Sequence, residues 1–123
     1  MGQKLTGQRQ NGEAERINGK EQPFRIVLST KLENNYEFKD LKERDIKEFH
    51  HFLRETVYKK LSITTVERDW LRQKGDAPPD FYQGGIEMIH LGKSASKFRL
   101  FGYYDINGCF VLCKIDPGHN THS

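Results

Sequence analysis

The chain has 123 residues, of which 35% are hydrophobic and 30% are charged, and its formal net charge is +3. This length predicts one domain, although the hydrophobic fraction is low for a packed one. The sequence contains neither an apolar run of about 18 residues nor the apolar core of a signal peptide, so we expect a cytoplasmic protein without a membrane partner. The mild positive charge is compatible with nucleic acid binding but does not establish it.

Residues 1–22 contain almost nothing apolar and show no periodicity. A segment of this composition cannot bury enough apolar surface to offset the entropy that ordering costs. We therefore expect a flexible N-terminal tail, residues 1–22, followed by a single α+β domain, residues 23–123.

The domain is predicted to follow the order β-α-α-β-β-β. Residues 24–28 are an apolar run typical of a strand. A helix is expected next, because apolar residues recur at spacings of three and four, at Ile46, Phe49, Leu53, Val57 and Leu61. Thr64-x-x-Glu67 is typical of the start of a second helix, which contains Trp70 and ends at Gly75. Residues 86–91 are a further strand candidate.

The last two strands are predicted from residues 98–106 and 109–115, which flank Asn107-Gly108. This dipeptide is the strongest short-range hairpin signal, because a type I′ turn needs a positive φ at both central residues. The pairs expected on the apolar face are Ile106–Cys109, Tyr104–Val111, Gly102–Cys113 and Leu100–Ile115. The pairs expected on the second face are Arg99–Asp116, Phe101–Lys114 and Tyr103–Leu112.

These elements predict an α+β fold of the two-layer sandwich type. An antiparallel sheet would carry both helices on its apolar face and leave its second face partly open to solvent. In particular, we expect the apolar face to pack against the helices through Leu100, Val111, Cys113 and Ile115.

The second face gathers basic and aromatic side chains. The candidate catalytic residues are Arg99, Tyr103, His119 and His122, and the candidate substrate-binding residues are His90, Lys93, Lys97, Phe101 and Lys114. Cations neutralise phosphates and rings stack on unpaired bases, so the set is typical of a single-stranded RNA platform. It also suits metal-free cleavage by the substrate's own 2′-hydroxyl, because histidine or tyrosine can transfer protons while arginine stabilises charge on phosphorus. No cofactor is expected.

Other interpretations of these residues stay open. Arg99 and Asp116 could form an ordinary cross-strand ion pair, and the two histidines could belong to a frayed tail. Asp116 with His119-x-x-His122 offers three possible metal ligands, but this spacing in an irregular tail is a weak signal compared with a helical H-E-x-x-H.

The element order in a small basic chain resembles the RelE/ParE-like toxin superfamily of toxin–antitoxin modules. The closing segment FRLFGYYDINGCFVLCKIDPGH is similar to the sheet of such proteins, where an arginine-bearing strand and an Asn-Gly or Asp-Gly hairpin precede a final hydrophobic strand and a terminal histidine. The resemblance covers residues 24–122. Two departures are a longer N-terminal tail and helices without the Lys/Arg density of ribosome-docking members.

For RelE-like members the resemblance implies metal-free cleavage of ribosome-associated mRNA and an antitoxin protein as partner. Arg99 would then match the transition-state arginine, and His119 or His122 the proton-transfer residue. Lys93, Lys97 and Lys114 would form a cationic rim. ParE-like relatives act on gyrase and lack the nuclease residues, so the superfamily alone does not imply a nuclease. The alternative function is a non-catalytic module of phage or mobile-element origin that binds nucleic acid or a protein.

Overall fold

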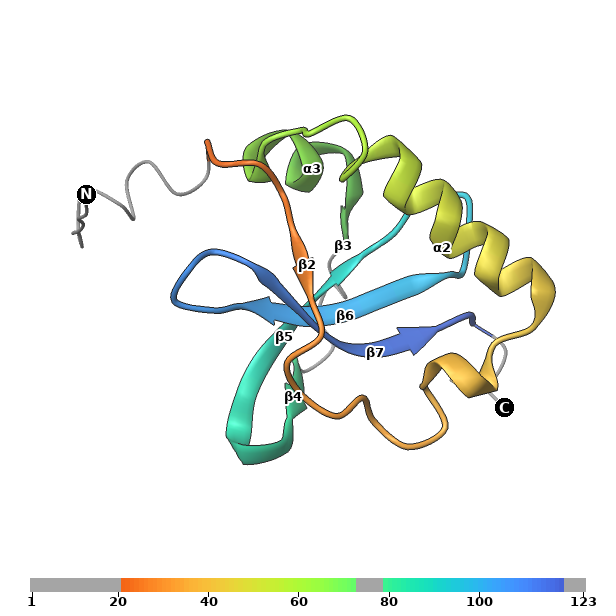
Figure 1. The fold of residues 1–123 in the computed structure, drawn as a ribbon. Helices are drawn as coiled ribbons and strands as arrows, with labels where there is room; N and C mark the ends of the chain where they lie inside the picture. The colour runs from red at the N-terminus through yellow and green to blue at the C-terminus, as the bar shows by residue number, and fades with distance from the viewer. Residues whose placement is uncertain (1–20, 73–78, 119–123) are drawn as a thin grey trace.

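A computed structural model of the chain describes residues 21–72 and 79–118. In chain order its elements are β2 (Ile26–Val27), the 3₁₀ turn η2 (Phe38–Asp40), α2 (Glu43–Glu55), α3 (Ile63–Trp70), β3 (Leu71–Arg72), β4 (Asp80–Tyr82), the 3₁₀ turn η3 (Gln83–Gly85), β5 (Ile86–Leu91), β6 (Arg99–Tyr104) and β7 (Phe110–Asp116). The strands form a curled six-stranded sheet, and Figure 1 shows α2 and α3 on the same side of it. The predicted α+β class is therefore confirmed.

The sheet is mixed rather than antiparallel. Its order is β2-β7-β6-β5-β3, with β4 also paired to β5. The antiparallel meander β5-β6-β7 agrees with the sequence prediction, but β2 runs parallel to β7. Both helices and the other strands lie between β2 and β7 in the chain. This connecting segment is long enough for the crossover that a parallel pair of strands needs. The predicted element order also lacked β3 and β4, which form the edge beside β5.

The β6–β7 hairpin turns through three residues, not through the predicted two-residue type I′ turn. The amide of Gly108 donates to the carbonyl of Asp105 at 2.9 Å, and Gly108 has a φ of 79°. This is a type I turn followed by a glycine bulge. The side chain of Asp105 favours it, because its Oδ1 accepts from the amides of Asn107 and Cys109, each at 2.9 Å.

The longer turn shifts the pairing near it by one residue, and a bulge in β7 restores the predicted register. Tyr104 pairs with Phe110 instead of the predicted Val111. On the side of the irregularity at Phe101/Gly102 that is farther from the turn, the pairs are those predicted, and the last of them is Arg99 opposite Asp116. The extra residue on β7 is Cys113. Since neighbouring residues of a strand point to opposite faces, the shift exchanges the faces of the strand segment next to the turn.

Both faces of the sheet are therefore buried in part. The cluster under the helices includes Phe52, Val66, Trp70, Leu91, Leu100, Phe110, Leu112 and Ile115. A second cluster on the other face contains Tyr82, Met88, Phe101, Val111 and Cys113. The prediction was thus right for Leu100 and Ile115, but Val111 and Cys113 pack on the face away from the helices.

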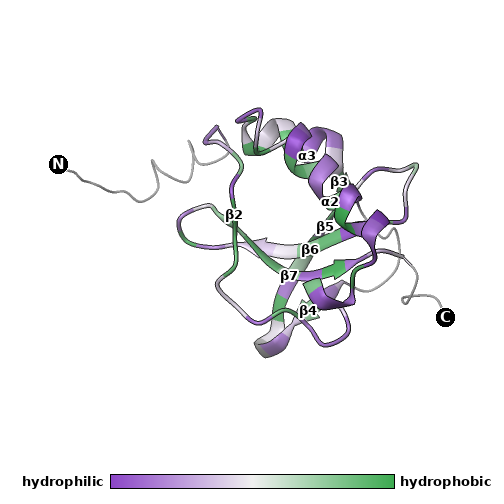
Figure 2. Cartoon of the chain, turned by 45° about the vertical axis from the view of Figure 1, so that its right-hand side comes forward, coloured by the Kyte–Doolittle hydropathy of each residue, from purple (hydrophilic) through white to green (hydrophobic). Residues whose placement is uncertain are grey.

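The segment after β2 covers part of the second face. The amide of Glu33 donates to the carbonyl of Cys113 at 2.9 Å, and the amide of Ile115 donates to the carbonyl of Tyr36 at 3.1 Å. The hydroxyl of Tyr82 donates to the carbonyl of Lys31. Figure 2 shows hydrophilic residues over much of α2 and hydrophobic stretches along the central strands.

The first helix, α2, is shorter than its predicted apolar stripe. It begins where Oδ2 of Asp45 accepts from the amide of Lys42 at 2.9 Å, and it ends at Glu55. Phe52 is the helix residue that reaches the core, at 2% exposure, whereas Ile46 is 54% exposed. The stripe predicted a helix at the correct place, and its residues Phe49, Leu53, Val57 and Leu61 pack against the core, whereas Ile46 does not.

Replacement of Leu100 by alanine should lower the free energy of unfolding by about 2–5 kcal/mol, because Leu100 is fully buried between the helices and the sheet. Leu28→Ala is the matched control, since Leu28 is 59% exposed and should change stability little. Denaturant titration measures both. Equal effects of the two replacements would contradict the packing described above.

Residues 1–20 should be dispensable for folding. Gln22 belongs to the domain, because its Nε2 donates to the carbonyl of Asn107 at 3.0 Å and its carbonyl accepts from the amide of Ile63 at 3.1 Å. A chain that begins at Glu21 should keep its thermal midpoint within a few degrees of the full chain in a calorimetric scan. A large loss would mean that residues 1–20 contribute to the core.

Candidate functional site

Four adjacent strands place one row of side chains on the second face of the sheet. Arg72 on β3 pairs with His90 on β5, His90 pairs with Phe101 on β6, and Phe101 pairs with Lys114 on β7. We call these four residues the cross-strand row. Directly paired residues point to the same face, and strands lie about 4.8 Å apart, so the row is about 14 Å long. Arg72 was not among the predicted site residues.

His90 is the most enclosed polar member of the row. It is 9% exposed, and its Nε2 lies 2.8 Å from Oδ2 of Asp80. Asp80 reaches the ring because it pairs with Met88, two residues before His90 on the same face of β5. The ring centroids of His90 and Phe101 are 4.2 Å apart. A carboxylate and an aromatic ring therefore fix the orientation of the imidazole.

Phe101 and Lys114 are engaged in packing. The Nζ atom of Lys114 lies 4.7 Å from the ring centroid of Phe101 and 4.3 Å from that of Tyr36. These cation–π contacts help to hold the segment that contains Tyr36 against the sheet. Phe101 is only 5% exposed, so little of its ring is left for a nucleotide base to contact.

Arg99 lies on β6 next to the row and fastens the β5–β6 loop, residues 92–98. Its Nη1 donates to the carbonyls of Lys93, Ser96 and Phe98 at 3.1, 2.6 and 2.8 Å. The side chain crosses Gly92 so closely that a Cβ atom there would lie 2.8 Å from Nη1 and 2.9 Å from Cδ. Glycine is thus required for this path of the arginine.

Arg72 and Arg99 are close enough to influence each other's charge. Partial burial lowers the pKa of Arg99; the charge of Arg72 lowers it further, while Asp116 raises it. Arg72 donates from Nη2 to the carbonyl of Asp69 at 3.3 Å. Its Nε is buried and, in the described part of the chain, has no hydrogen-bond partner. This end of the row therefore combines two partly buried positive charges with an unfilled donor.

Two other predicted residues lie away from this end. Tyr103 pairs with Val111 near the hairpin turn. Burial raises the pKa of its phenol, and the neighbouring Cys113, Tyr82 and Asp105 raise it further. A raised pKa keeps Tyr103 protonated at neutral pH, so it is not a ready base. The Nζ atom of Lys93 lies 4.5 Å from the ring centroid of Trp70, on the helix side of the sheet.

The remaining predicted residues concern the loop and the C-terminus. Lys97 is exposed, and its backbone lies against Gly118, where an added Cβ would come within 3.1 Å of the Lys97 carbonyl oxygen. His119 and His122 lie outside the described residues, and so does the proposed His119-x-x-His122 metal site. The structure therefore brings together Arg99, His90, Phe101 and Lys114, but it does not place the two histidines.

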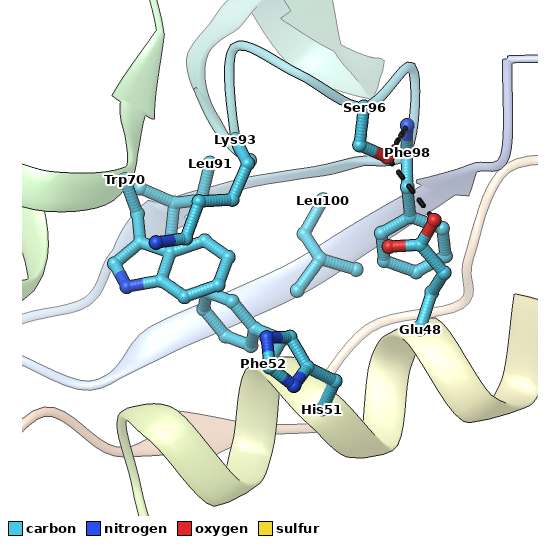
Figure 3. Close-up of a pocket in the computed structure, with 10 residues that line it drawn as sticks. Glu48, His51, Phe52, Trp70, Leu91, Lys93, Ser96, Phe98 and Leu100 are labelled. Atoms are coloured by element: carbon cyan, nitrogen blue, oxygen red, sulfur yellow. Dashed lines mark hydrogen bonds between the residues drawn. The ribbon is translucent and has the colours of Figure 1, made fainter.

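A small hollow lies on the helix side, between α2 and the β5–β6 loop (Figure 3). Its residues include Glu48, His51, Phe52, Trp70, Leu91, Lys93, Ser96, Phe98 and Leu100. The space open to the centre of a water molecule is about 20 Å³, which is room for one water rather than a substrate. Ser96 donates to Oε1 of Glu48 at 3.1 Å and accepts from the amide of Phe98 at 3.1 Å. These bonds fasten the loop to α2.

Sequence reasoning missed Arg72 and Asp80. Arg72 lies where the sequence predicts the second helix, and Asp80 follows Pro78-Pro79 in a predicted loop. They meet His90 only because β3 and β4 pair with successive parts of β5 on the same edge. No local spacing indicates this arrangement.

None of the helices in the described ranges combines the length and the apolar character needed to cross a membrane. Within residues 21–72 and 79–118, no three His, Cys, Asp or Glu side chains are grouped so that they could hold a metal ion.

Comparison with known proteins adds no assignment. The chain matches no protein-family model, and searches of curated proteins and of solved structures returned no match. The resemblance to the RelE/ParE-like superfamily stays a prediction.

Arg99→Ala should lower the free energy of unfolding by about 1–3 kcal/mol, because the loop carbonyls lose a charged donor. Gly92→Ala should also destabilise, since the added Cβ would lie 2.6 Å from the carbonyl oxygen of Phe98. Arg25→Ala serves as the control, because Arg25 is exposed. If denaturant titration finds Arg99→Ala and Arg25→Ala equally stable, Arg99 does not stabilise the β5–β6 loop as described.

Proposed function

We propose that this protein binds single-stranded RNA through phosphate groups at the β3 end of the cross-strand row. The supporting observation is the convergence of Arg72, Arg99 and His90 from three strands onto one end of the second face. Phosphate neutralisation supplies most of the affinity of such interfaces, and the planar guanidinium group matches phosphate oxygens in pairs. In this proposal the fold acts as a two-layer sandwich whose helices cover one face of the sheet while RNA meets the other.

The surroundings of this end support a nucleic acid rather than a small ligand. Lys97 is exposed in the adjoining β5–β6 loop, where it adds a positive charge that a bound RNA strand could contact. The RelE-like resemblance adds mRNA, including ribosome-bound mRNA, as substrate class, the cytoplasm as location and an antitoxin as protein partner.

A second candidate function is metal-free endoribonuclease activity of the RelE kind. The Asp80–His90 contact of 2.8 Å favours it, because an imidazole oriented by a carboxylate is a common proton-transfer unit. In that reaction the 2′-hydroxyl loses its proton and attacks phosphorus, the bond to the 5′-oxygen breaks, and that oxygen receives a proton. Arg99 would stabilise the charge on phosphorus, and His90, His119 or His122 would transfer protons.

Fluorescence anisotropy with a labelled single-stranded RNA tests the binding proposal. The logarithm of the binding constant should fall with the logarithm of salt concentration with a slope near −1.4, for about two phosphates, one at Arg72 and Arg99 and one at Lys97, at roughly −0.7 each. Arg72→Gln should weaken binding and reduce the slope by about 0.7. Arg25→Gln removes the same charge from an exposed site next to β2, at the opposite end of the strand order from β3, and should change neither value. Absence of binding at low salt, or equal effects of the two variants, would reject the proposal.

Cleavage is tested by incubating RNA with the protein, with and without ribosomes. We expect EDTA to have no effect and His90→Gln to lower the rate by about 10²–10⁴, the usual contribution of a general acid or base. Circular dichroism checks that the variant is folded. Binding without cleavage would select the non-catalytic module, and failure of both assays would reject RNA as the partner of the second face.

A further inference from the structure

The buried Nε of Arg72 is an exception to the usual pairing of buried donors. In the described part of the chain this atom has no hydrogen-bond partner. Buried polar groups are nearly always bonded to protein, water or an ion, and an unfilled donor on a charged group is costly. Nη2 of Arg72 donates to the carbonyl of Asp69 at 3.3 Å, and Arg72 pairs with His90 where β3 lies against β5. The side chain is therefore held at this edge of the sheet while its Nε stays covered.

The charge distribution around Arg72 favours an anion at the same place. The positive charges of Arg72 and Arg99 repel each other, and both side chains are partly buried. The nearby carboxylates have partners of their own. Asp80 contacts His90 at 2.8 Å, and Oδ1 of Asp116 accepts from the amide of Gly118 at 2.8 Å. A negative group between the two guanidinium groups would relieve their repulsion and fill the open donor.

We propose that Arg72 and Arg99, with His90 beside them, form a binding site for one tetrahedral oxyanion, a phosphate group. Nε and a neighbouring Nη of Arg72 present two parallel donors to it, and Arg99 adds a second positive charge. A phosphodiester of the RNA backbone offers two non-bridging oxygens and one negative charge, which a planar guanidinium group can bind with paired donors. The inference deepens the proposed function, since the RNA backbone is then the source of the phosphate.

The test uses inorganic phosphate as the probe and the Nε–H signals of the arginine side chains in nitrogen–proton NMR spectra. The Arg72 signal is identified by its loss in Arg72→Lys. During titration at constant ionic strength it should shift and saturate, while the signal of the exposed Arg25 stays in place. Arg72→Lys keeps the charge but loses the paired donors. It should weaken phosphate binding about tenfold, measured from the shift of the Arg99 Nε–H signal during the titration. Arg25→Lys should leave it within about twofold.

Adding single-stranded RNA then shows whether the site takes a phosphate of the RNA backbone or only free phosphate. The wild-type spectra suffice for this test if a variant fails to fold. Displacement of phosphate by single-stranded RNA at the Arg72 signal supports both the site and the proposed function. Saturable phosphate binding that RNA does not displace supports the site but contradicts RNA as its ligand. RNA binding that moves other signals, with no response of Arg72 to phosphate or RNA, would overturn the oxyanion site and leave RNA binding intact. A uniform drift of all arginine signals with phosphate would likewise overturn it.

Discussion

The register of β6 against β7 is the constraint on which the rest of the structure depends. Phe101 stands opposite Lys114 and beside His90, so this pairing aligns the whole cross-strand row. A slip of one residue would turn Leu100 out of the core and Arg99 into it. The Cys113 bulge prevents that slip, because it compensates for the residue by which the Asp105 turn exceeds a two-residue hairpin.

Arg99 links the candidate site to the helix layer. One of its nitrogens holds the β5–β6 loop, and the same loop contacts α2 through Ser96 and Glu48 and covers Trp70 through Lys93. A replacement of Arg99 therefore changes both the charge of the site and the support of the loop. Arg72 is the better residue for separating function from folding, because the bond described for it is a single one to Asp69.

The sequence predicts the parts of this fold that depend on local pattern. The three-strand meander follows from apolar runs around one turn. The pairing of Arg99 with Asp116 was predicted from a two-residue turn, and it holds because the Cys113 bulge offsets the longer turn. The strands β3 and β4 do not, because segments of two and three residues have no period to detect. The mixed sheet was missed for a related reason, since the pairing of β2 with β7 joins distant parts of the chain.

The candidate site was predictable in part. Arg99, His90, Phe101 and Lys114 were expected on one face and share it, but the burial of Phe101 and His90 was not expected. It arises from Asp80, Tyr36 and the second apolar cluster, which reach this face through long-range packing. Arg72 is the residue most dependent on tertiary structure, because only the pairing of β3 with β5 brings it to His90.

RNA is proposed to contact the β3 end of the second face. A map of backbone amide shifts, recorded while single-stranded RNA is added to the full chain, tests it most directly. We predict that the largest shifts occur at Arg72, His90 and Arg99, with little change along the outer side of α2. Shifts concentrated on α2 or near β2, with those three amides unmoved, would contradict it.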